Sequence, residues 1–63
     1  MPQITKNELE SIRNQLISEE NLIRQFSACA HMASDPQLRT FFEQIAARHT
    51  LHRDTLEALL KEG

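Results

Sequence analysis

The chain contains few of the residues on which β-sheet proteins and disulfide-stapled small domains depend. It has no tryptophan, no tyrosine and one glycine, Gly63, at the very end of the sequence. Because tight hairpin turns rely heavily on glycine, the pattern disfavours a β fold. The one cysteine, Cys29, has no second cysteine with which to form an internal disulfide.

Other functional classes are disfavoured by charge and hydropathy. Seven Lys and Arg against nine Asp and Glu give a net charge of −2, so we expect no nucleic-acid partner. The hydrophobic runs are too short for a transmembrane span or the core of a signal peptide, so we expect no membrane partner. A free thiol without a secretion signal favours the cytoplasm as the location.

Size sets the main physical problem. A chain of 63 residues, 40% of them hydrophobic, forms one small domain that buries only ~60% of its unfolded surface by itself. Domains of this size usually need a staple or a partner. Because an internal disulfide is excluded, we expect a helical unit stabilised by self-association, by a metal ion, or by both.

Local signals predict two long helices. Thr5-Lys6-Asn7-Glu8 fits a capping box, and the chain then runs to Pro36 without an interior proline or glycine. Proline pushes Asp35 out of helical geometry, so Asp35 is expected to cap a second helix with Pro36 in its first turn. We therefore expect one helical hairpin over 1–63, with helices over about 5–33 and 36–61.

The hairpin is expected to be antiparallel because a link of residues 34–35 is too short for the second helix to run parallel to the first. A lone pair of helices leaves half of each apolar stripe exposed to water. Pairing with a second copy about a two-fold axis would cover both stripes. The predicted fold class is therefore all-α, an antiparallel two-helix hairpin that dimerises into a four-helix bundle.

Apolar residues follow alternating steps of three and four along both helices, as in a heptad pattern. Three polar residues interrupt this seam: Glu19, His49 and His52. The seam positions in the first helix are Leu9, Ile12, Leu16, Glu19, Ile23, Phe26, Ala30 and Ala33, and those in the second are Leu38, Phe42, Ile45, His49, His52, Leu56 and Leu59.

The three exceptions are predicted to meet in one layer. A fold centred between residues 35 and 36 places Glu19 opposite His52 and Phe26 opposite Ile45. His49 lies three residues before His52 and shares its helix face. A two-fold axis would double the layer to two glutamates and four histidines near the middle of the bundle.

Two interpretations of this polar layer are open. Buried polar groups cost several kcal/mol unless they have partners, and a Glu–His pair can serve only to fix register and partner choice. Alternatively, imidazoles and carboxylates that converge in a bundle core form a metal site. Three such residues in one layer, at helix-compatible spacing, favour the metal interpretation.

The same residues resemble a family. Glu19, followed on the next helix by His49-Thr50-Leu51-His52, resembles the ferritin-like pattern of a glutamate on one helix and Glu-x-x-His on its neighbour. The closest architecture is that of the encapsulated ferritins, in which a helical hairpin completes a di-iron site only on dimerisation. Asp35-Pro36-Gln37-Leu38-Arg39 is similar to the helix start of coat-protein relatives from spore formers. The resemblance spans residues 9–60 and implies metal binding with iron-related redox or storage chemistry, in the cytoplasm or associated with a spore coat or compartment.

The sequence departs from this family at two positions. His49 stands where the family has the bridging glutamate, and Phe26 stands where many relatives carry a tyrosine. The dimer would then set two carboxylates against two metal ions, whereas the family sets four carboxylates against them. This smaller negative charge disfavours diferric iron. An imidazole-rich set suits zinc, copper, nickel or ferrous iron better. We therefore expect Glu19, His49 and His52 to bind a transition metal ion, with ferroxidase activity altered or lost.

Other candidate residues have simpler interpretations. Glu20 lies beside the seam and either adds a carboxylate or pairs with Arg24 on the surface. Cys29 and His31 are two residues apart and point to different sides of a helix, which disfavours a chelate. Cys29 also lacks a neighbouring base for nucleophilic catalysis.

The partner prediction also has alternatives. A homodimer or higher homo-oligomer is expected, and Ile17, Met32 and Leu51 face outward, either as ordinary exposed residues or as contacts in a larger assembly. A coat-like structural protein would use the polar layer only to specify assembly. An adaptor hairpin would instead complete its bundle with a different chain.

Overall fold

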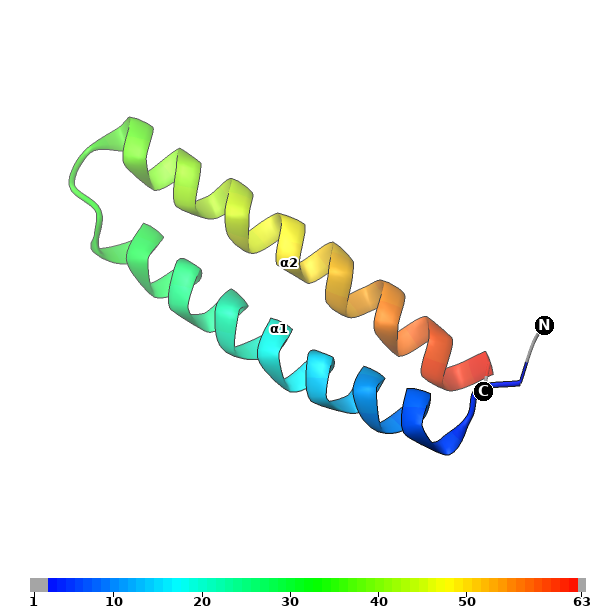
Figure 1. The fold of residues 1–63 in the computed structure, drawn as a ribbon. Helices are drawn as coiled ribbons and strands as arrows, with labels where there is room; N and C mark the ends of the chain where they lie inside the picture. The colour runs from blue at the N-terminus through cyan, green and yellow to red at the C-terminus, as the bar shows by residue number, and fades with distance from the viewer. Residues whose placement is uncertain (1–2, 63) are drawn as a thin grey trace.

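Two helices of equal length form an antiparallel hairpin (Figure 1). The computed structural model describes residues 3–62, with α1 over Lys6–Met32 and α2 over Pro36–Glu62. The described residues contain no strand, and neither helix is long and apolar enough to cross a membrane. The predicted all-α hairpin is confirmed, and residues 1–2 and 63 of the predicted domain lie outside the described part.

A capping box starts α1 as predicted. The Thr5 hydroxyl accepts a hydrogen bond from the Glu8 backbone N–H at 3.1 Å, and a Glu8 carboxylate oxygen accepts one from the Thr5 N–H at 2.9 Å. These bonds satisfy two backbone donors that a helix start otherwise leaves without partners. The hydrogen bonds from the Thr5 backbone and side chain also lower the pKa of Glu8.

The turn between the helices is held by side chains at both ends. Ala33 follows α1 in an extended conformation, with φ −71° and ψ 128°, and its carbonyl accepts a hydrogen bond from the Arg39 guanidinium at 2.8 Å. The Asp35 carboxylate accepts from the Gln37 N–H at 2.9 Å, which confirms Asp35 as the cap of α2. The link therefore comprises three residues, 33–35.

This link changes which residues face each other. The link is centred on Ser34 and not between residues 35 and 36. Each residue of α1 therefore faces a residue of α2 that lies about one helical turn earlier in the sequence than predicted. Glu19 lies nearest His49, at 2.6 Å, with His52 further away at 3.6 Å. Phe26 likewise packs against Phe42, with ring centroids 6.2 Å apart. The sequence-based pairing was displaced by about one turn.

The hairpin has almost no enclosed core of its own. Among the described residues, the buried apolar side chains are Ala30 and Ala46, and the buried charged one is Glu19. The chain exposes 5012 Å², whereas a compact monomer of the same mass exposes roughly 4200 Å². Its radius of gyration is 14.5 Å, against about 11 Å for a compact chain of this length.

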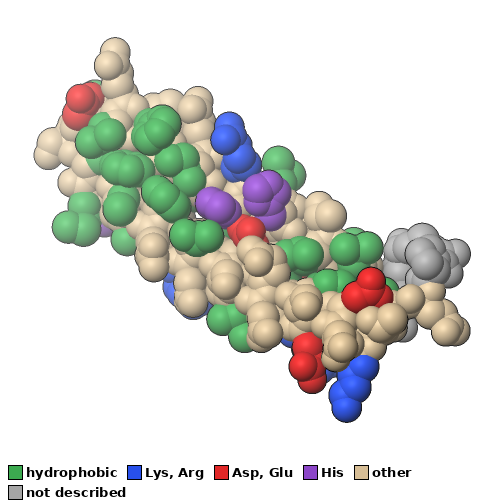
Figure 2. All heavy atoms as spheres, in the orientation of Figure 1, with side chains coloured by type: hydrophobic (Ala, Val, Ile, Leu, Met, Phe, Trp, Pro, Cys, Tyr) green, Lys and Arg blue, Asp and Glu red, His purple; other side chains and the backbone are tan. Residues whose placement is uncertain are grey.

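Several large apolar side chains near the turn are exposed or half-buried together. We call the group Phe26, Leu38, Phe41, Phe42 and Ile45 the apolar face; its aromatic rings form a chain from Phe26 through Phe42 to Phe41. Figure 2 shows hydrophobic side chains gathered near the turn and again beyond a group of imidazoles at half length. Leu38, predicted in the seam, is 45% exposed in the single hairpin.

Candidate metal centre

Three potential metal ligands converge at the middle of the hairpin. α1 contributes Glu19 and α2 contributes His49 and His52, and their donor atoms all lie within 4.8 Å of one another. His49 and His52 reach the same place because residues three apart share a helix face. The structure thus brings together all three residues that the sequence singled out.

The carboxylate of Glu19 lies at the centre of this cluster. Its side chain is only 7% exposed, and Oε2 lies 2.6 Å from Nδ1 of His49. Oε1 accepts a hydrogen bond from Nε2 of Gln15 at 3.1 Å and lies 3.6 Å from Nδ1 of His52. Because an ionised carboxylate can only accept hydrogen bonds, Nδ1 of His49 carries the proton of the shorter contact.

The surroundings of Glu19 favour its ionised form. Burial acts to raise the pKa of this carboxyl, but the hydrogen bonds from His49 and Gln15 and the charges of His49 and His52 outweigh it. The pKa of Glu19 therefore lies below its ordinary value of 4.5. Glu19 is a carboxylate at neutral pH, which is the form that binds metal ions.

The two histidines differ in how firmly they are held. The His49 ring stacks on Phe26 with centroids 6.0 Å apart and planes 10° apart, and its side chain is 22% exposed. The His52 ring meets His49 edge-on at 5.7 Å and is 55% exposed. Packing therefore fixes the orientation of His49, whereas His52 keeps a side open to the surface, where Figure 2 shows imidazoles beside a carboxylate.

Two of the donor-atom distances can be compared with those of a small transition metal site. In a tetrahedral site with bonds of about 2.0–2.2 Å, neighbouring donor atoms lie roughly 3.3 Å apart. The 3.6 Å between His52 and Glu19 is close to this separation. The 2.6 Å between His49 and Glu19 is a hydrogen-bond length, so this pair would have to open by somewhat less than 1 Å if both residues were to bind one metal ion.

Two contacts of the cluster were not predicted from the sequence. Gln15 lies four residues before Glu19, a spacing at which helical side chains meet, so its hydrogen bond was detectable from the pattern. Phe26 was predicted to lie in the apolar seam opposite Ile45, and the structure shows that it also supports the His49 ring by stacking. Glu20 is exposed and lies outside the cluster.

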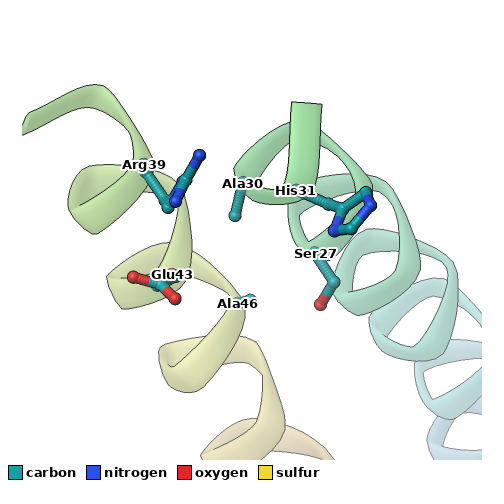
Figure 3. A pocket seen from close by; sticks show the side chains of 6 residues that line it. All are labelled: Ser27, Ala30, His31, Arg39, Glu43 and Ala46. Atoms are coloured by element: carbon teal, nitrogen blue, oxygen red, sulfur yellow. The ribbon is translucent and has the colours of Figure 1, made fainter. Parts of the chain in front are cut away.

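His31 and Cys29 lie apart from this centre. Cys29 is exposed, and His31 belongs to the rim of an open groove of about 580 Å³ between the helices near the turn. Figure 3 shows the His31 ring pointing away from Arg39 and Glu43 across that groove. The Arg39 guanidinium is already bonded to the Ala33 carbonyl. The groove therefore does not bring its polar groups together on one point, as a ligand site would.

The cluster can therefore hold a metal ion, with two nitrogen donors and one oxygen donor from two helices. Such a set is typical of zinc and of the other late divalent ions of the first transition row. Three protein ligands leave a further coordination position for water or for a residue of another chain. The sequence matches no protein-family model, no curated protein and no solved structure.

Proposed function

We propose that this chain is a ferritin-like metal-binding protein that works as a homodimeric four-helix bundle. In this proposal the apolar faces of two hairpins pack together, and Glu19, His49 and His52 of each hairpin bind a transition metal ion inside the bundle. The observation that carries the proposal is the convergence of two imidazoles, those of His49 and His52, on the buried carboxylate of Glu19.

Exposed surface supports the pairing of two hairpins. The hairpin exposes 5012 Å², which is about 800 Å² more than a compact monomer of its mass. A standard protein interface buries about 800 Å² on each partner. The apolar face supplies large side chains for such an interface, among them Phe41, which is 55% exposed in the single hairpin. Pairing over this face would also cover the open side of His52.

The donor set limits which metal ion fits. Two hairpins supply two carboxylates and four imidazoles, so two trivalent ions would keep a large uncompensated charge. Neutral imidazole is a good ligand for zinc, copper, nickel and ferrous iron. We therefore propose a divalent ion of this group as the cofactor, with iron-related redox or storage chemistry altered or lost relative to the ferritins that the sequence resembles.

Metal analysis of the purified protein tests this function. The wild-type chain should bind Fe²⁺, Zn²⁺, Cu²⁺ or Ni²⁺ and melt at a higher temperature with the ion than without it, because an ion that binds only the folded state stabilises it. His49→Ala and His52→Ala should abolish both effects. Metal-free protein whose melting temperature is unchanged by all four ions would refute the proposal.

A structural, coat-like role is the second candidate, and one observation favours it. Both Glu19 oxygens already have protein hydrogen-bond partners, His49 and Gln15, so the layer is complete as a hydrogen-bonded pair. Replacing a buried polar cluster with apolar residues is often neutral or stabilising. In that case the triple variant Glu19→Leu, His49→Leu and His52→Leu should remain a folded dimer of equal or higher stability, and the wild type should bind no metal.

An adaptor hairpin would behave differently in solution. If the apolar face is completed by a different chain, the purified protein should sediment as a monomer and show weak, non-cooperative helix melting. A dimer at micromolar concentration with a cooperative transition would exclude this role. Sedimentation and circular dichroism on the same sample therefore separate the adaptor from the two homodimeric candidates.

A further inference from the structure

Charged side chains gather on one side of the hairpin. On α1 the residues of that side recur at steps of seven, four, three and four, which keep one helix face: Arg13, Glu20, Arg24, Ser27 and His31. Arg39, Glu43 and Arg53 of α2 line the same hollows as the later members of this row, so they lie on the same side. We call this side the charged side, and the groove of Figure 3 lies on it.

The opposite side, which we call the uncharged side, carries almost no charge along the length of the helices. Its row on α1 lies two residues earlier in the chain, so it points away from the charged side, and it follows the same steps: Ser11, Ser18, Leu22, Gln25 and Cys29. Leu22 precedes Phe26 by four residues, which places this row beside the apolar face. On α2, between residues 38 and 59, Arg48 is the one charged side chain on this side.

The lack of charge is notable because much of this row is exposed in the single hairpin. Ser11, Ser18 and Gln25 are all exposed, and the solvent-facing side of a helix usually carries charged residues. The centre of a protein interface is instead depleted of charge, because a charge that is buried without a partner costs free energy. The composition of the row is therefore that of a surface covered by another chain.

The length of the uncharged side also matters. Glu19 and His49 are the middle residues of α1 and α2, and the apolar face lies wholly in the half of the hairpin nearer the turn. The hairpin measures 46 Å by 17 Å, so one whole side presents roughly 800 Å², which is what a standard interface buries on each partner. The half near the turn offers about 400 Å² per hairpin, or about 800 Å² in a dimer, which is less than the about 1,000 Å² of a specific interface.

We propose that a second copy of the chain covers the uncharged side over its whole length, so that Ser11 and Ser18 lie against the partner hairpin as Phe41 does. This inference rests on the homodimer proposed above. It deepens that proposal because it extends the interface from the apolar face into the half of the hairpin where the row on α1 is polar but uncharged. The charged side then remains exposed to solvent in the dimer.

Glutamate substitutions of matched serines on the two sides of α1 test the inference. Ser18→Glu should raise the dissociation constant of the dimer at least tenfold, because a two-fold interface would bury two added carboxylates. Ser11→Glu should act in the same direction, and Ser18→Ala should leave the dimer intact. Ser27→Glu, on the charged side, should change the constant by less than a factor of about two. Analytical ultracentrifugation measures all constants, with a chelator and again with one equivalent of Zn²⁺.

The outcomes separate this inference from the proposed function. Dissociation by Leu38→Glu but by neither Ser11→Glu nor Ser18→Glu would confine the interface to the apolar face, which overturns the inference and leaves the homodimer standing. Dissociation by Ser27→Glu equal to that by Ser18→Glu would also overturn the inference. A wild-type chain that stays monomeric under both conditions would overturn the homodimer as well. Circular dichroism of each variant confirms that the helices remain formed.

Discussion

Nδ1 of His49 lies 2.6 Å from Oε2 of Glu19, although the two residues are 30 positions apart in the chain. This contact joins α2 to α1 at the middle of the hairpin and gives the buried carboxylate a partner. It also holds a proton where the donor set could hold a metal ion. A single contact therefore belongs both to the stability of the hairpin and to the proposed function.

Removing either histidine of the cluster should weaken metal binding strongly. His49→Ala and His52→Ala each remove a ligand. Loss of a residue that only hydrogen-bonds to a ligand lowers metal affinity by about 10- to 100-fold, so we expect the affinity for Zn²⁺ to fall by more than this. Isothermal titration calorimetry measures this change. His31→Ala is the matched control, since His31 lies at a separate groove, and an equal loss in this variant would contradict the assignment.

Charge placed on the apolar face should separate the dimer. Leu38→Glu should raise the dissociation constant at least tenfold, because burial of a leucine side chain contributes about 1.5–3 kcal/mol and a buried glutamate adds a desolvation cost. Analytical ultracentrifugation measures the constant. Leu38 and Leu51 are 45% and 67% exposed on the same helix, and Leu51 lies outside the apolar face.

Leu51→Glu is therefore the matched control for pairing through the apolar face. It should leave the dissociation constant unchanged within a factor of about two, since an exposed substitution away from the interface changes stability by less than ~0.5 kcal/mol. Dissociation caused equally by both variants, or by Leu51→Glu alone, would show that another surface pairs the hairpins.

Acid should destabilise the metal-free protein partly through Glu19. The pKa of this carboxyl is lowered on folding, so its contribution to stability is complete above its ordinary value of 4.5 and is lost as the pH falls through the folded pKa. We expect the difference in free energy of unfolding between wild type and Glu19→Gln to shrink over this range. Urea unfolding between pH 7 and pH 3 in the presence of a chelator measures it, and a difference that grows with acid would contradict the sign.

Loss of the capping box should weaken the start of α1 without affecting the metal centre. Thr5→Ala removes the hydroxyl that accepts from the Glu8 N–H, and such changes cost about 1 kcal/mol of stability. Thermal unfolding measures the loss. Thr5→Ser, which keeps an acceptor in place, should retain most of the stability, and Zn²⁺ affinity should be the same in all three proteins.

The sequence predicted the helices well because their ends depend on neighbouring residues. Thr5 and Glu8 lie within one turn and cap each other wherever α1 packs, and Asp35 caps α2 through the backbone of Gln37. The meeting of Glu19 with His49 and His52 was also predictable. All three residues lie on the apolar seams of the two helices, and these seams face each other in an antiparallel hairpin.

The exact partners within the cluster depended on features that no local pattern specifies. Ala33 leaves the helix, and the centre of the turn lies at Ser34 and not between residues 35 and 36, so His49, instead of His52, lies within 2.6 Å of Glu19. The stacking of Phe26 on His49 is likewise not specified by a local pattern, since the two rings come from different helices.

By itself, then, the sequence determined the helices, their apolar seam and the three polar residues within it, because helix capping and side-chain periodicity act over one or two turns. Only the tertiary structure decided which imidazole bonds to Glu19 and that the large apolar side chains remain partly exposed. Those features depend on how far one helix is displaced along the other. That displacement is set by the conformation of residues 33–35 and by the packing of whole side chains.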